Sequence, residues 1–318
     1  MRVAAADIGT NSTRLLVADV SGGAVEEVIR LLEITRLGQG VDASGELHGT
    51  AIARVLDCLA RYAASAREHG AERLLAVATS AARDASNRDA LLAAIAETGF
   101  VPRVLTGVEE AQTTFAGVLS AGTPAAGTLV IDVGGGSTEL VLGGEDGAVV
   151  WSCSLQMGCV RMTERFLGEQ QVDAAALADC VAEVRRLLEV VPVSLAGRIA
   201  RAIGVAGTAT TAASIELGLA AYDPERIHGA RLTRAAIARI GERLGAITLD
   251  RRLGVAGLEP KRAPVIVAGL VVLGTVLDEL GLAELTVSER DILHGAALLA
   301  AGTISCSTRL RSPGWWNG

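Results

Sequence analysis

The sequence reads DIGTNSTRLLV at residues 7–17 and DVGGGSTELVL at residues 132–142, and this internal repeat decides the fold. When the two stretches are superposed, Asp7 falls on Asp132. In both copies an apolar run precedes the aspartate, another follows the loop, and a glycine turn comes next. Each copy therefore predicts three strands, with a tight glycine turn between the first two and a second turn before the third.

Helices and further strands follow each copy in a similar order. In the first half, apolar spacing predicts helices at 50–69, 88–97 and 109–119 and strands at 74–78 and 101–105. In the second half it predicts helices at about 158–167, 173–190, 208–218, 233–245 and 263–280, strands at 202–206 and 285–287, and a last helix from residue 291. This order indicates an α/β protein of two similar domains flanking an interdomain cleft.

The segment at 120–127, which reads SAGTPAAG, is the best candidate for a linker between the halves. We therefore predict one domain over 1–121 and a second over 122–318, whose last helix returns toward the first domain. The second domain ends in a polar tail with Trp315 and Trp316, which we expect to fray.

Composition limits the classes of protein that fit. The chain has 318 residues, of which 50% are hydrophobic and 20% charged, and this is enough apolar material for two cores. Aromatic residues make up only 3%, so stacking platforms for single-stranded nucleic acid are not expected. A net charge of −7 argues in the same direction, and the sequence predicts no nucleic-acid partner.

Cysteine usage and the start of the chain indicate a cytoplasmic protein. The five cysteines form no C-x-x-C pair, which fits a reducing compartment and neither a disulfide framework nor a zinc ribbon. The N-terminal MRVAAADIG reaches a polar turn too soon for a signal peptide, and the most apolar stretch, 265–277, is too short for a membrane span. The sequence predicts no membrane contact and leaves open whether the chain forms a homodimer.

The two repeated loops have the composition of a phosphate-binding nest. Glycine allows several backbone N–H groups to point at one spot, and Ser and Thr add hydroxyl donors. An aspartate beside such a nest makes sense if a metal ion bridges the carboxylate and the phosphate. One copy alone would also fit an ordinary glycine hairpin, but two matching copies favour phosphate binding. The candidate phosphate-binding residues are Gly9, Asn11, Ser12, Gly134, Gly135, Gly136, Ser137 and Thr138, and the candidate metal ligands are Asp7 and Asp132.

Two further segments link a strand to a helix and carry groups that suit an anion. GVAGTATT at 204–211 places Gly207 and Thr208 at a helix N-terminus, where free N–H groups and the helix dipole favour negative charge. ATSAARDA at 78–85 carries Arg83, which suits bidentate phosphate binding. The alternative for Arg83 is a salt bridge with Asp84 or another neighbour.

These motifs, DIGTNSTRLL, ATSAARDASN, TGVEEA, DVGGGSTEL and GVAGTATT, resemble the Ppx/GppA family of exopolyphosphatases and guanosine pentaphosphate phosphohydrolases. The resemblance runs from Asp7 to the VSERDILHG segment at 287–295. It implies two ribonuclease-H-like domains of the actin-like ATPase type that close around a phosphate chain. Longer members of the family carry additional C-terminal domains, so the chain resembles the short form.

Glu109 and Glu110 begin a helix, where acidic residues also serve as ordinary caps. The resemblance implies that Glu110 is the catalytic glutamate and orients the attacking water. It also implies that Glu139 lies near the metal or that water, and that Arg14, its counterpart in the first loop, faces phosphate. A Mg²⁺ ion, or Mn²⁺ in its place, would then neutralise the phosphate oxygens.

One position departs from the family pattern. Family members often carry an arginine in a segment like S-x-x-G-L-R-x-G, and the matching residue here is Leu293. We therefore expect one anion contact to be missing, unless Arg290 supplies it. Three other arginines, Arg36, Arg161 and Arg165, are candidates for a basic track along a polyphosphate chain.

The sequence thus predicts an exopolyphosphatase that removes terminal phosphate from inorganic polyphosphate. The main alternative is hydrolysis of pppGpp or nucleoside polyphosphates, which a weakened polyphosphate track would favour. A sugar- or acetate-kinase-like transferase is a rival, although no sugar-binding segment is evident. A non-catalytic polyphosphate or alarmone sensor is another, although it would not need Glu110 and Glu139.

Overall fold

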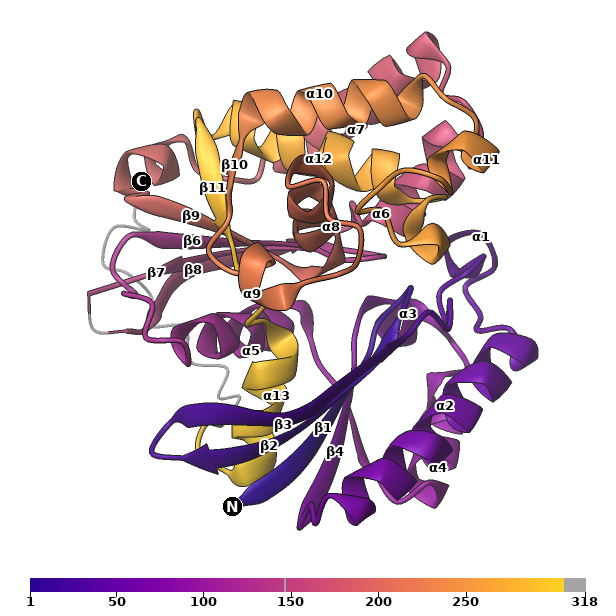
Figure 1. The fold of residues 1–318 in the computed structure, drawn as a ribbon, viewed down its shortest axis with the longest axis vertical. Helices are drawn as coiled ribbons and strands as arrows, with labels where there is room; N and C mark the ends of the chain where they lie inside the picture. The colour runs from indigo at the N-terminus through magenta and orange to yellow at the C-terminus, as the bar shows by residue number, and fades with distance from the viewer. Residues whose placement is uncertain (146, 306–318) are drawn as a thin grey trace.

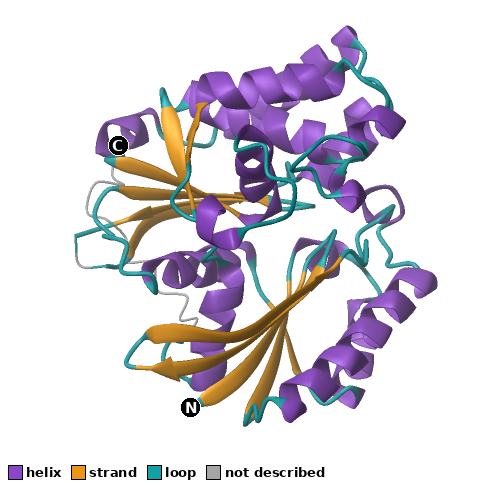
Figure 2. Ribbon diagram, viewed as in Figure 1, coloured by secondary structure: helices purple, strands orange, loops and turns teal. Residues whose placement is uncertain are grey.

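The computed structural model describes residues 1–145 and 147–305, which form two mixed sheets with helices packed around them (Figure 1; Figure 2). The predicted α/β fold with two similar halves is confirmed. Trp315, Trp316 and the rest of the predicted tail lie outside the described residues. None of the described helices is long and apolar enough to cross a bilayer.

The first sheet has the order β3-β2-β1-β4-β5 expected of a ribonuclease-H-like domain. Its strands are β1 (Arg2–Ile8), β2 (Thr13–Ser21), β3 (Ala24–Glu33), β4 (Arg73–Ala78) and β5 (Val101–Val104). The first three strands are antiparallel, and β4 and β5 run parallel to β1. In this register Asp7 at the end of β1 lies opposite Arg14 on β2.

The second sheet repeats this arrangement in the order β10-β11-β9-β6-β7-β8. Its strands are β6 (Thr128–Val133), β7 (Thr138–Gly143), β8 (Val149–Leu155), β9 (Arg201–Val205), β10 (Arg231–Thr233) and β11 (Glu284–Val287). Asp132 lies opposite Glu139, as Asp7 lies opposite Arg14, so the predicted repeat is confirmed in structure. The sequence analysis missed β10, because three residues are too few to give an alternating pattern.

The long predicted helices are present with bounds shifted by a few residues, and several short helices lie between them. The full set is as follows. In the first half they are α1 (Val41–Ser44), α2 (Gly49–Glu68), α3 (Ser80–Asp84), α4 (Arg88–Glu97) and α5 (Gly107–Leu119). In the second half they are α6 (Cys159–Met162), the π turn η1 (Thr163–Leu167), α7 (Ala174–Leu188), the 3₁₀ turn η2 (Val193–Arg198), α8 (Ala206–Glu216), α9 (Pro224–Ile227), α10 (Arg234–Gly245), α11 (Leu249–Arg252), the 3₁₀ turn η3 (Pro260–Arg262), α12 (Ile266–Glu279) and α13 (Ile292–Ala301). The predicted helix at 158–167 is present as α6 followed by η1. The other short helices had no predicted range, since one turn carries no readable apolar period.

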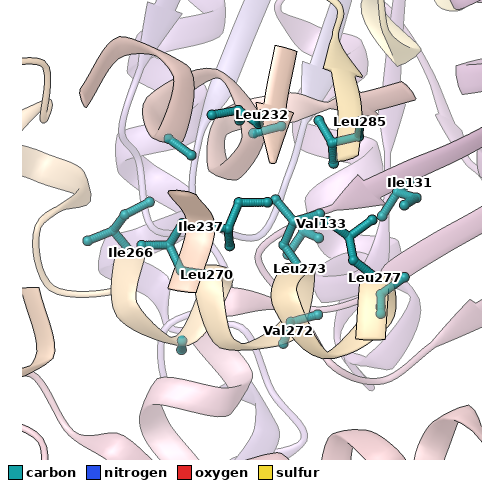
Figure 3. Packing of buried hydrophobic residues seen from close by; sticks show 14 of the residues in the cluster. Ile131, Val133, Leu232, Ile237, Ile266, Leu270, Val272, Leu273, Leu277 and Leu285 are labelled. Atoms are coloured by element: carbon teal, nitrogen blue, oxygen red, sulfur yellow. The ribbon is translucent and has the colours of Figure 1, made fainter. Parts of the chain in front are cut away.

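Each sheet is covered on its outer face by its own helices. Helices α2 and α4 pack on the first sheet, and α7, α8, α10 and α12 pack around the second. Figure 3 shows Leu273 and Leu277 of α12 beside Val133 and Ile131 of β6. These aliphatic clusters are the two cores that the composition predicted.

Helices α5 and α13 lie between the two sheets (Figure 1). Phe115 of α5 packs with Val130 and Val141 of the second sheet. Leu293 of α13 packs with Leu16 of the first sheet, so the last helix contacts strands near the N-terminus. The predicted boundary at residue 121 stays a prediction.

The two central helices touch through their backbones. A Cβ added at Gly117 of α5 would lie 1.9 Å from the carbonyl oxygen of Asp291, and one added at Gly295 of α13 would lie 1.9 Å from that of Thr113. A backbone carbonyl cannot move aside as the end of a flexible side chain can. Glycine is therefore required at both positions of this crossing.

We expect Gly295→Ala to lower the free energy of unfolding by about 1–3 kcal/mol, because the added methyl group forces the helices apart. Urea denaturation measures this change. Gly274→Ala is the matched control, since its Cβ would meet only Ile237, at an ordinary 3.6 Å, and alanine favours a helix. Equal stability of Gly295→Ala and the wild type would show that the crossing is not tightly packed.

Candidate functional site

A cavity of about 70 Å³ lies where the two repeated loops meet. Both loops make the same turn: the Gly9 amide donates to the Ser12 carbonyl at 2.9 Å, and the Gly134 amide donates to that of Ser137 at 3.0 Å. Thirteen of the predicted site residues line the cavity: Asp7, Gly9, Asn11, Ser12, Arg14, Glu110, Asp132, Gly134, Gly135, Gly136, Ser137, Gly207 and Thr208. The fold thus brings together most of the residues that the motifs singled out.

The second loop is held with its carbonyls turned away from its own amides. The carbonyl oxygens of Gly134, Gly135 and Gly136 accept hydrogen bonds from the amides of Cys159, Val160 and Gly158, at 2.9, 2.8 and 3.1 Å. In a trans peptide the N–H points opposite to the C=O. The amides that follow these carbonyls therefore point away from the start of α6, as in an anion-binding nest.

The loops also contact each other directly. A Cβ at Gly135 would lie 2.8 Å from Cβ of Thr10, and one at Gly136 would lie 2.5 Å from Oγ of Ser80. Thr10 Oγ1 and Asn11 Nδ2 are buried without a hydrogen-bond partner in the part of the chain that the structure describes. Both residues line the cavity, so unsatisfied polar groups face the space where a ligand would bind.

Buried carboxyl groups gather around this cavity. Burial raises the pKa of Asp7, although Arg14 opposes the effect. Burial and the neighbouring Glu139 raise the pKa of Glu110 well above its usual range. Burial, Asp291 and Glu110 raise the pKa of Asp132 to about 8. In all three carboxyl groups burial is the main cause, and the neighbouring arginines do not fully offset it.

Glu109 and Glu110 have different environments, although they are adjacent in sequence. Glu109 completes a capping box with Thr106 at the start of α5 and pairs with Arg103 at 2.7 Å. The ordinary capping role is therefore confirmed for Glu109. Glu110 is buried, lines the cavity and forms an ion pair with Arg83.

Three predicted site residues do not line the cavity. Arg83 is not in the lining; it pairs with Glu110, donates to the carbonyl of Leu105 at 3.0 Å, and its Nη2 lies 3.5 Å from Oγ of the lining residue Ser137. Thr138 donates its hydroxyl to the Met157 carbonyl at 2.8 Å. Local partners thus hold both side chains, and their roles in phosphate binding stay predictions.

Glu139 is the third, and it is buried behind the second loop. Its Oε1 accepts a hydrogen bond from Ser154 Oγ at 2.7 Å, and its Oε2 has no partner among the residues described. Burial and the nearby Asp132 raise the pKa of Glu139 to about 7.

Arg14 lines the cavity as predicted, but it is held by two carboxylates. Its Nη2 pairs with Asp7 Oδ2 at 2.6 Å, and its Nη1 pairs with Asp291. Asp291 caps α13 by accepting from the Leu293 amide at 3.0 Å. Burial works against the charged form of Asp291, but Arg14 holds its pKa well below the usual range. Sequence reasoning missed Asp291; its one signal was its place before an apolar helix.

Arg262 is the second residue that sequence reasoning missed. It ends η3, lines the cavity and is partly buried, and burial lowers its pKa. A Cβ at Gly207 would lie 1.7 Å from Nη1 of Arg262, so glycine makes room for the guanidinium. Within the described chain no carboxylate forms an ion pair with Arg262.

The expectation for Leu293 is wrong. Leu293 is fully buried in the apolar cluster beneath the first sheet, because the phase of α13 turns it away from the cavity. Arg290 does not replace an anion contact either, since it donates to the Val25 carbonyl at 2.7 Å.

Of the arginines that were candidates for a basic track along polyphosphate, Arg161 and Arg165 both form ion pairs with Asp42.

Two glycine-rich loops face each other, and buried carboxylates lie beside them. This arrangement defines an α/β protein that acts on phosphate at a site between two sheets. The chain belongs to the Ppx/GppA phosphatase family, whose model matches residues 15–300. The family resemblance read from the motifs is therefore confirmed.

Several known proteins are similar over nearly the whole chain. Exopolyphosphatase 2 of Mycobacterium tuberculosis is 42% identical, and the match covers 95% of this chain and 99% of that protein. A guanosine-5'-triphosphate,3'-diphosphate pyrophosphatase of Aeromonas hydrophila is 29% identical over 97% of this chain and 61% of its own length. The Aquifex aeolicus member of the family has a solved structure with a TM-score of 0.79 at 29% identity, covering 96% of this chain and 99% of that one.

We expect Leu293→Arg to destabilise the protein severely, because it would bury a charge with no partner in an apolar cluster. Thermal unfolding followed by circular dichroism measures the effect. Leu253→Arg is the matched control, since Leu253 is 45% exposed and its replacement leaves the melting temperature nearly unchanged. A folded, equally stable Leu293→Arg protein would mean that the position faces open space after all.

Proposed function

We propose that this protein hydrolyses the terminal phosphoanhydride bond of inorganic polyphosphate and releases orthophosphate. The observation that carries the proposal is the pair of loops packed against each other over Glu110 in one cavity. The 42% identity with a protein named exopolyphosphatase 2 supports the same substrate class. In this proposal the chain is an enzyme that cuts a phosphoanhydride with water.

The cavity holds donors that suit a phosphate chain. The amides of the second loop and the Arg262 guanidinium would donate to phosphate oxygens, and Asn11, whose Nδ2 is buried without a partner in the described chain, lies beside them. Ser12 and Ser137 add hydroxyl groups from the matching loops. All of these groups can bind phosphate oxygens, and none of them is placed to recognise a nucleotide base. They therefore favour inorganic polyphosphate as the substrate.

A Mg²⁺ ion fits the charge of this cavity. Asp7 and Asp132 are buried at the ends of the matching strands β1 and β6, and the raised pKa of Asp132 reflects negative charge that a cation would balance. No group of three or more potential ligands gathers in the described part of the chain. That suits Mg²⁺, which binds through one or two carboxylates together with water and substrate phosphates. When bound there, the ion would supply positive charge to the phosphate oxygens.

Glu110 is placed to orient the attacking water and accept its proton. Arg83 fixes the carboxylate, and the raised pKa makes it a better proton acceptor than an ordinary glutamate. The water oxygen forms a bond to the terminal phosphorus as the bridging P–O bond breaks. The shortened chain leaves with the electron pair of that bond, and orthophosphate remains.

Hydrolysis of pppGpp is the second candidate, because several relatives at about 30% identity are named guanosine-5'-triphosphate,3'-diphosphate pyrophosphatases. A phosphate-release assay with Mg²⁺ across tripolyphosphate, long polyphosphate, pppGpp and ATP separates the candidates. The highest kcat/KM on inorganic chains would support the proposal. Release from pppGpp alone would favour the alternative, and no release from any of the four would favour a sensor.

We expect Glu110→Gln to lower kcat by about 10²–10⁴-fold with little change in KM, because only the group that orients water is altered. Glu109→Gln is the matched control, since this neighbour caps α5 outside the cavity. Steady-state phosphate release measures both variants. Near-normal turnover by Glu110→Gln would rule out its assignment.

Activity should be lost in EDTA and return with Mg²⁺ or Mn²⁺. We expect Asp132→Ala to remain inactive at metal concentrations that restore the wild type, because a buried ligand is missing. The melting temperature of the wild type should also rise when Mg²⁺ is added. Full activity in excess chelator would show that these carboxylates do not serve a metal.

A further inference from the structure

Arg14 lies on β2 just after the first loop, and two carboxylates hold its side chain. Its Nε and Nη2 donate to the same oxygen of Asp7 at 3.0 and 2.6 Å, while its Nη1 donates to Asp291. The side chains of Arg14, Asp7 and Asp291 are at most 9% exposed. One guanidinium is therefore held between two buried carboxylates at the wall of the cavity.

Asp291 cannot easily move away from this contact. Its Oδ1 caps α13 by accepting from the Leu293 amide at 3.0 Å, which leaves Oδ2 directed at Arg14. The first turn of α13 is itself anchored, because His294 Nε2 lies 2.8 Å from Oε1 of Glu27 on β3. The carboxylate is thus fixed at the start of a helix that packs against the first sheet and against α5.

The two arginines at the cavity differ in their partners. Near the second loop, Arg262 has no carboxylate partner among the residues the structure describes. Near the first loop, Arg14 carries one positive charge against the two negative charges of Asp7 and Asp291. If Asp7 is engaged with a cation, Asp291 alone still neutralises Arg14.

We propose that Asp291 is a specificity-determining residue that withholds Arg14 from phosphate and so limits affinity for highly charged phosphate chains. It acts through Arg14 and is a positioning residue, not a catalytic one. The inference rests on the proposed function, since it assumes that phosphate groups occupy this cavity. A terminal phosphate would bind at the second loop and Arg262, and the next phosphates would meet the first loop, where Asp291 opposes them.

The test is calorimetric titration with inorganic tripolyphosphate in the presence of Mg²⁺, carried out in Glu110→Gln protein to prevent turnover. Asp291→Asn keeps the oxygen that caps α13 but removes the charge beside Arg14. We expect at least fivefold tighter binding of tripolyphosphate and a smaller gain for orthophosphate. In otherwise unaltered enzyme, KM for tripolyphosphate should fall while kcat changes less than twofold.

Two controls isolate the contact with Arg14. Glu289→Gln removes the same charge two residues away, where the carboxylate pairs with Arg30 at 2.6 Å and with Tyr222, and it should leave binding unchanged. The gain from Asp291→Asn should vanish in an Arg14→Gln background, because there is no guanidinium to release. Asp291→Ser, which also caps helices well, replaces Asp291→Asn if that variant does not fold.

Unchanged or weaker tripolyphosphate binding by Asp291→Asn, with normal binding by the wild type, would overturn this inference alone. A higher Mg²⁺ requirement in that variant would also overturn it, because Asp291 would then be helping to hold the cation. Absence of binding to any phosphate chain by both proteins would overturn the inference together with the proposed function.

Discussion

The burial of several carboxylates close together is the constraint on which the rest of this site depends. Asp7, Asp132, Glu110, Glu139 and Asp291 are all at most 7% exposed around one cavity. An unpaired buried charge is costly, so each group needs a cation, a donor or a proton. Arg14 and Arg83 meet part of this need, and the raised pKa values of Asp132 and Glu110 mark what they leave unmet. A site of this charge suits a substrate that arrives with its own metal ions.

The two central helices connect this charge cluster to the fold. Helix α5 carries Glu110 in its first turn, and α13 begins at Asp291. Their backbones meet at Gly117 and Gly295, so the glutamate and the aspartate are placed by the same helix crossing. Because α5 packs on the second sheet and α13 on the first, a shift of either sheet would alter the cavity. Ion pairs such as Arg161–Asp42 add further contacts between the halves.

The motifs predicted the loops well because each requirement there is local. A turn in which a glycine amide bonds the carbonyl three residues on is encoded within one stretch, and it appears twice. The residues that the sequence analysis missed or misplaced depend on distant partners. Arg262 is one of 28 arginines with no distinguishing neighbour, and its closeness to Gly207 arises only when η3 meets α8. Arg83 was predicted to bind phosphate, and only the folded chain shows that it pairs with Glu110, which lies 27 residues away in the sequence.

The sequence by itself determined the two-sheet α/β fold, the paired loops and the family, because apolar periodicity and glycine turns act over short stretches. It also singled out Glu109 and Glu110 without separating them. Only the tertiary structure decided that Glu109 caps a helix while Glu110 enters the cavity, and that Leu293 is buried while Asp291 meets Arg14. The physical reason is that burial and charge pairing are set by which helix face meets which sheet, and elements far apart in the chain settle that together.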